Sequence, residues 1–154
     1  MKCRKIFILA SLCLLCSCSI LAEKRAQGRS YASVDHLRQM IHHALNLSDY
    51  GRGPMPEVLP CDFKTPGGRE YIRFYPVGTR PNRIHNPHLT PAIVEPVEEF
   101  AEQGWANVAF MDGHVERVQG HFRHQQELYD VLLARCSGEC RAQVESFIQE
   151  LKKS

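Results

Sequence analysis

The stretch GWANVAFMDGHVERVQ, from Gly104 to Gln119, constrains the fold of this chain more than any other segment. Two short apolar runs, NVAFM and VERV, flank a central Asp-Gly-His. Asp-Gly between apolar runs is a strong β-hairpin signal, because a type I′ turn needs positive φ at both central residues, which Asp tolerates and Gly adopts freely. We therefore predict a hairpin here. The simplest interpretation of Asp112, Gly113 and His114 is turn chemistry alone.

The remaining pattern predicts one α+β domain at residues 33–154, with a small antiparallel sheet at about 70–119. Ser33 is expected to be the N-cap of the first helix, and Ser137-Gly138 to separate the last two helices. The predicted elements are a helix at 34–47, strands at 70–77, 92–97, 107–111 and 115–118, and helices at 121–135 and 139–152. Helical or alternating apolar spacing supports these assignments.

The first 17 residues have the pattern of a bacterial signal peptide, with a basic segment at Met1–Lys5 and an apolar run at Ile6–Leu15. The apolar run is shorter than the roughly 20 residues that span a bilayer. The following LCSC resembles a lipobox, which predicts lipidation of Cys18 and a polar tether at residues 18–32. The alternative is ordinary cleavage after Ala22. Both predict export to the bacterial cell envelope.

The charge of the exported chain argues against a nucleic-acid partner. Once Lys2, Arg4 and Lys5 of the leader are set aside, 16 basic residues remain against 17 acidic ones. A chain so close to neutral has no basic field for phosphates. The expected partners are the membrane, through the lipid anchor, and an unidentified envelope protein or ligand.

The hairpin stretch is also similar to the prepilin-type processing-associated family that is named for a His, nine residues and Asp-Gly. The matching residues are Asn107, Val108, Phe110, Asp112, Gly113, His114 and Val115. The segment at Pro91–Pro96 resembles the strand that precedes this motif, and the resemblance covers roughly residues 71–118. It implies the family's sheet and a pseudopilin-like relationship, but no activity. The family's His would stand at Glu102, so no histidine role is carried over to that position.

Metal binding is the sharpest chemical alternative. Four potential ligands fall within thirteen residues, namely Asp112, His114, His121 and His124. Imidazole and carboxylate are ordinary zinc ligands, and His121 and His124 would lie one turn apart on the predicted helix. The simpler interpretation is a set of surface histidines on a polar connection. His85 and His88 give a weaker signal.

Three cysteines follow Cys18 in the sequence: Cys61, Cys136 and Cys140. An exported protein permits disulfides, and Cys136 and Cys140 stand four residues apart around the expected helix break. A bridge between these two is possible, and it would leave Cys61 unpaired.

Two functional hypotheses follow. The first is an exported, lipid-anchored envelope protein that works by non-catalytic binding or assembly and needs no cofactor. The alternative is a metal-binding protein or metal-dependent enzyme centred on Asp112 and His114. Metal analysis of the purified protein separates the two.

Overall fold

The computed structural model describes residues 2–101 and 103–153, so Glu102, where the family's His would stand, lies outside the described residues. The chain divides into two compact units, Met1–Ala32 and Ser33–Ser154. Helix α1, Lys2–Leu47, belongs to both units. It includes the backbone of Cys18 and the segment expected to be a tether. In the part of the chain that the structure describes, no helix is long and apolar enough to cross a membrane.

The second unit contains a four-stranded antiparallel sheet in the order β1-β2-β3-β4. Its strands are β1 (Ile72–Arg73), β2 (Pro91–Val94), β3 (Trp105–Phe110) and β4 (Val115–Gln119). A 3₁₀ turn at Pro81–Arg83 and a single helical turn, α2 (Val97–Phe100), lie in the connections. Two helices follow the sheet, α3 (Gln125–Ala134) and α4 (Gly138–Leu151). The predicted α+β class is therefore confirmed.

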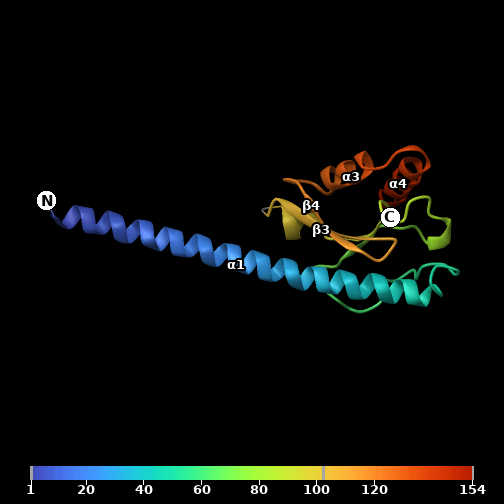
Figure 1. Cartoon of the computed structure of the whole chain (residues 1–154), viewed down its shortest axis with the longest axis horizontal. Helices are drawn as coiled ribbons and strands as arrows, with labels where there is room; N and C mark the ends of the chain where they lie inside the picture. The colour runs from blue at the N-terminus through green and yellow to red at the C-terminus, as the bar shows by residue number, and fades with distance from the viewer. Residues whose placement is uncertain (1, 102, 154) are drawn as a thin grey trace. The chain divides into compact units, whose positions relative to one another are not determined.

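Helices cover both faces of this sheet. Residues 33–47 of α1 lie on one side, and α3 and α4 lie on the other (Figure 1). Phe74, just after β1, contacts the second helical layer through Tyr129 and Phe147, with ring centroids 5.3 and 6.4 Å apart. The largest fully buried side chains are Leu37, Met40, Ile41, Met55, Phe74, Tyr75, Ile93, Phe100, Phe110, Met111, Leu128 and Leu132. Burial of this apolar surface stabilises the unit.

The hairpin forms where it was predicted, but its turn differs from the expected type I′. The Gly113 N–H donates to Phe110 O and the Phe110 N–H donates to His114 O, both at 2.9 Å. Gly113 has a φ of +92°, whereas Asp112 is not among the residues with positive φ. The connection is thus a three-residue loop with glycine in the left-handed position, another common hairpin closure.

Several element boundaries also differ from prediction, including the end of β2 at Val94 instead of residue 97. Ser33 lies inside α1 instead of capping it, because the preceding residues continue the helix, and its hydroxyl donates to Glu95. Residues 70–77 form only a two-residue strand, since Pro76 and the turn after it leave the sheet. Helix α3 begins at Gln125, so the predicted start at His121 is wrong.

Candidate functional site

The candidate site forms where the β3–β4 turn meets the turn that precedes β2. In the upstream turn, the backbone N–H groups of Leu89 and Thr90 both donate to Asn86 O, at 3.1 and 3.0 Å. The Met111 N–H then donates to Thr90 O at 3.0 Å, which ties the upstream turn to the hairpin. As a result, His88 is held against the tip of the hairpin although it is far from it in sequence.

Asp112 lies between two imidazoles. Its Oδ2 is 2.9 Å from His88 Nδ1, and its Oδ1 is 2.5 Å from His114 Nδ1. One potential ligand atom from each of the three residues lies within 4.8 Å of the other two. We call His88, Asp112 and His114 the hairpin triad. Ligand atoms bonded to one zinc ion at about 2.0–2.2 Å lie roughly 3–4 Å apart, so a small closing movement would suit an ion.

The triad is partly ordered by its own contacts. The His114 ring lies between two others, with centroids 4.5 Å from Phe110 and 4.4 Å from His88. The His114 N–H also donates to Asp112 Oδ1 at 3.2 Å. Burial raises the pKa of Asp112, but hydrogen bonds from His88 and His114 outweigh it, so the pKa is below its ordinary value. Asp112 is therefore a carboxylate at neutral pH.

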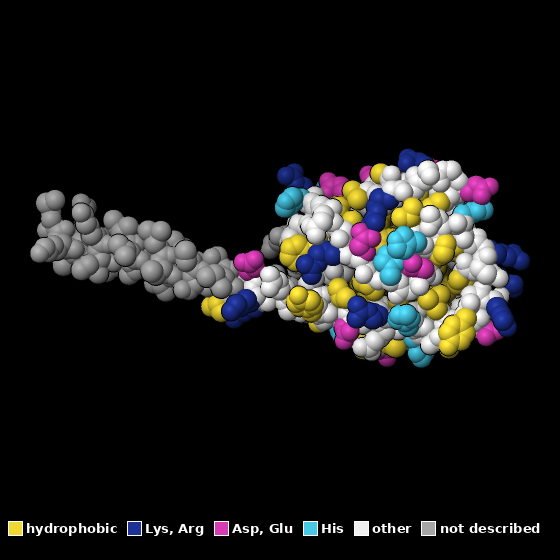
Figure 2. Space-filling model, viewed as in Figure 1, with side chains coloured by type: hydrophobic (Ala, Val, Ile, Leu, Met, Phe, Trp, Pro, Cys, Tyr) yellow, Lys and Arg dark blue, Asp and Glu magenta, His cyan; other side chains and the backbone are white. Residues whose placement is uncertain are grey.

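The triad is open to solvent, with side-chain exposures of 68% for His88, 31% for Asp112 and 30% for His114. Figure 2 shows histidine and acidic side chains next to one another on the visible face of the molecule. A hollow of about 300 Å³ adjoins Asp112 and is lined by Leu45, Tyr50, Gly51, Pro81, Asn82, Pro87, Met111 and Asp112. An ion on the triad would thus remain accessible to a small ligand.

His121 and His124 do not join Asp112 and His114 in the only potential metal-ligand group found among the described residues. The reason lies in the chain path after β4. His121 precedes α3, beside Gly104, and His124 is the N-cap residue of α3 within a capping box with Glu127. These two histidines therefore do not share a helical face.

His88 belongs to the triad, although its sequence signal is weaker than those of Asp112 and His114. It lies 24 residues before Asp112, in a connection rich in turns. The available signal was the antiparallel pairing of the strands, since β2 begins opposite the end of β3, with Pro91 paired to Phe110. A residue just before β2 must then lie close to the hairpin tip.

A second polar cluster is buried at the other end of β3. The Asn107 N–H donates to Glu95 Oε2 at 2.7 Å, and Asn107 Nδ2 donates to Glu95 Oε1 at 3.1 Å. The Ser33 hydroxyl donates to the same carboxyl and lies 3.0 Å from the Tyr71 hydroxyl. Burial raises the pKa of Glu95 despite these hydrogen bonds. Because Ser33 belongs to α1 and Asn107 to β3, this buried cluster joins α1 to the sheet.

Most of the residues that resemble the family motif lie in or beside one of these two clusters. Asn107 belongs to the buried one, Asp112 and His114 belong to the hairpin triad, and Phe110 supports the His114 ring. Val115 pairs with Ala109 at the first position of β4. The side chain of Cys18 lies outside the described part of the structure.

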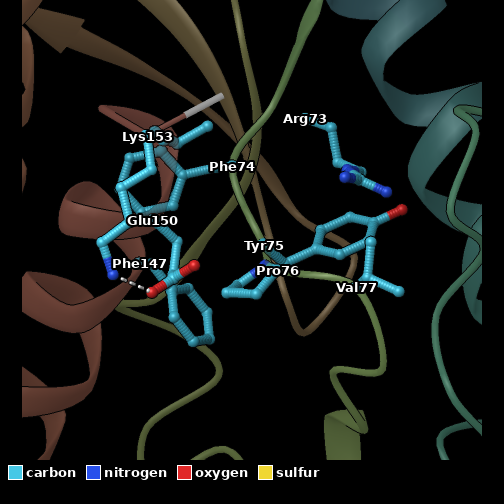
Figure 3. Close-up of a pocket in the computed structure, with 9 residues that line it drawn as sticks. Arg73, Phe74, Tyr75, Pro76, Val77, Phe147, Glu150 and Lys153 are labelled. Atoms are coloured by element: carbon cyan, nitrogen blue, oxygen red, sulfur yellow. Dashed lines mark hydrogen bonds and ion pairs between the residues drawn. The ribbon is translucent and has the colours of Figure 1, made fainter.

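Another hollow, of about 390 Å³, lies beside α4 and carries a different chemistry. Phe74, Tyr75 and Phe147 form much of its wall, and the Glu150–Lys153 ion pair, at 2.8 Å, lies at its edge (Figure 3). These side chains can pack against an apolar molecule. None of them belongs to the hairpin triad, where potential metal ligands gather. We therefore place the candidate function at the triad.

Comparison with known proteins adds no relative: no family model, no curated protein and no solved structure matches this chain.

Proposed function

We propose that this protein is an exported cell-envelope protein, lipid-anchored through Cys18, that binds a divalent transition-metal ion at the hairpin triad. The observation that carries the metal-binding part is the position of Asp112 between two imidazole nitrogens, 2.9 and 2.5 Å away. This arrangement favours the metal-binding alternative over binding or assembly without a metal. The leader sequence carries the export part.

The donor set defines the class of ion. Two imidazoles and one carboxylate suit Zn²⁺, Cu²⁺ or Ni²⁺, whereas Ca²⁺ and Mg²⁺ prefer sites made of oxygen atoms. Three protein ligands leave at least one coordination position for water or a small molecule. The hollow beside Asp112 offers room for such a molecule.

Binding must displace the protons that now join the triad. In the free protein, the two imidazole N–H groups donate to the Asp112 carboxylate, and an ion would replace both of these hydrogen bonds. Imidazole generally takes up a second proton near pH 6.5, so affinity should fall as the pH is lowered from about 7 to about 5.

Calorimetric titration of the purified protein with zinc tests the metal-binding part. We expect one ion to bind, and His88→Ala or Asp112→Asn to weaken binding at least about tenfold, because even supporting residues of metal sites contribute that much. His121→Ala is the matched control and should bind as the unmodified protein does. Absence of binding, or a loss confined to His121→Ala, would contradict the proposed site.

Cell fractionation tests the export part separately. The mature protein should sediment with membranes, because two or more acyl chains hold a protein firmly. Cys18→Ala should block maturation of the precursor. A mature chain that begins at Glu23 would show ordinary cleavage after Ala22 and would remove the lipid anchor from the proposal.

A further inference from the structure

The junction between α3 and α4 brings two buried thiols together. Helix α3 ends at Ala134 and α4 begins at Gly138, which has a φ of +53°. This left-handed conformation favours glycine and lets the chain change direction between the helices. Cys136 and Cys140 stand on either side of the break and are only 5% and 6% exposed.

The two thiols both contact the turn that carries His88. The Cys136 thiol lies 3.6 Å from Leu89 O, and Cys140 Sγ lies 3.9 Å from Thr90 Oγ1. Leu89 and Thr90 are adjacent in that turn, so both sulfurs contact the same short piece of backbone and its side chains. Burial, together with Cys140, raises the pKa of Cys136 to about 12. A thiol in this state is a poor nucleophile, which argues against a catalytic dithiol in the folded protein.

We propose that Cys136 and Cys140 are joined by a disulfide bond in the exported protein, where the bond clamps the α3–α4 junction beneath the His88 turn. The proposal uses the export part of the proposed function and does not depend on metal binding. Both sulfurs are free thiols in the structure. Their contacts with the adjacent residues Leu89 and Thr90, and the left-handed glycine between them, place them where a short loop can close.

The reaction is a thiol–disulfide exchange with a disulfide of the exported compartment. One thiolate attacks that disulfide, forms a mixed disulfide and releases the first thiol. The second cysteine then attacks the mixed disulfide, forms the Cys136–Cys140 bond and releases the second thiol. The two cysteines are oxidised, the donor disulfide is reduced, and both protons end on the released thiols. Because both thiols are buried, exchange should occur mainly during folding.

Cys61 provides an internal reference, because its thiol is free and exposed. The mature protein recovered from the envelope is denatured in an alkylating reagent without reductant and weighed by mass spectrometry. We expect one label, on Cys61, and three labels after reduction. Labelling of all three cysteines before reduction would overturn the proposal, and so would a bridge that includes Cys61.

A second experiment tests the disulfide without requiring that the protein be exported. The purified full-length protein, which has four further cysteines at positions 3, 13, 16 and 18, is refolded in glutathione buffer with the oxidised form in excess, and the labelled cysteines are located by peptide mass spectrometry. The pair should again resist the reagent, and a pair that stays fully labelled would overturn the proposal. If the protein is absent from the envelope, the export part of the proposed function fails and this experiment alone decides the disulfide.

A thermal melt tests the clamp. Reductant should lower the melting temperature of the oxidised protein by about 5 °C, which is the scale expected for a bridge that closes a short loop. Cys61→Ser should show the same shift, whereas the Cys136→Ser, Cys140→Ser double variant should show none. If reductant does not change the melting temperature of the oxidised protein, the proposed clamp is contradicted.

Discussion

Glu95 and Asp112 are two acidic side chains at opposite ends of strand β3, and their surroundings differ. Glu95 is buried, accepts hydrogen bonds from Ser33 and Asn107, and has a raised pKa. Asp112 is about one-third exposed, accepts hydrogen bonds from two histidines, and has a lowered pKa. A buried carboxyl satisfied by fixed neutral donors holds the fold together. The accessible carboxylate between imidazoles is where we propose that a cation binds.

The comparison predicts that Glu95→Ala has the largest effect on stability. The change leaves the Asn107 N–H and amide groups and the Ser33 hydroxyl without their buried acceptor. We expect a loss of about 2–3 kcal/mol in urea melts at pH 7, which is typical of unsatisfied buried groups. Glu98→Ala is the control, since this side chain is 49% exposed and should change stability little. Equal melts for both variants would refute the structural role of Glu95.

The second-largest loss of stability is expected for Gly113→Val, at the tip of the hairpin. Gly113→Val places a β-branched residue at a φ of +92° and puts its Cβ 3.3 Å from His42 Cε1. Such strain costs on the order of 1–3 kcal/mol, and His114→Ala should cost less. Gly68→Val shares the positive φ but meets no atom within 4 Å, so it isolates backbone strain. A larger loss for His114→Ala than for Gly113→Val would show that the turn depends more on the imidazole than on the glycine.

The two carboxyls should also differ in the sign of their pH dependence. The raised pKa of Glu95 means that the folded state binds its proton more tightly than the unfolded state does. Its contribution to the free energy of unfolding is therefore greatest below the unfolded value of about 4.5 and falls as the pH rises through the folded pKa. For Asp112, the contribution is present above about pH 3.8 and is lost as the pH falls through its lowered pKa.

Urea melts across pH, taken as differences between variant and unmodified protein, measure both signs. Glu95→Gln should become relatively more stable as the pH rises above about 4.5, and Asp112→Asn relatively more stable as it falls below about 3.8. If the stability differences of both variants change in the same direction with pH, the comparison between Glu95 and Asp112 is contradicted.

The smallest expected change in stability is that of Asp112→Asn. Asparagine keeps an acceptor oxygen for the His114 N–H, so the metal-free protein should melt within about 1 kcal/mol of the unmodified one. Zinc should raise the melting temperature of the unmodified protein, by mass action, and raise that of the variant clearly less. A chelator should reverse the increase. A melt that responds to zinc equally in both proteins would place the ion elsewhere.

The sequence predicted the elements whose signals are local. Asp112-Gly113 fixed the hairpin, and apolar spacing located α4 to within a residue at each end. The type of turn was not predictable, because Asp-Gly suits both two-residue and three-residue loops. The start of α3 was not predictable, because histidine is not one of the residues that favour the N-cap position, so the pairing of His124 with Glu127 has no clear sequence signature.

The candidate site depended on tertiary structure. Asp112 and His114 are neighbours in sequence and were identified as candidates, but the third ligand comes from a separate turn that only the β2–β3 register brings near. The role of Glu95 was hidden for the same reason, because its partners Ser33 and Asn107 are 62 and 12 residues away. Single-sequence patterns report periodicity and turns, and they do not report which turns meet.

Anomalous diffraction from zinc-soaked crystals tests the central claim most directly. We predict a single strong peak at the hairpin tip, about 2.0–2.2 Å from His88 Nδ1, His114 Nδ1 and an Asp112 oxygen. At the same zinc concentration, the peak should be clearly weaker in crystals of Asp112→Asn. A peak at His121 or His124, or none at the triad under saturating zinc, would contradict the account.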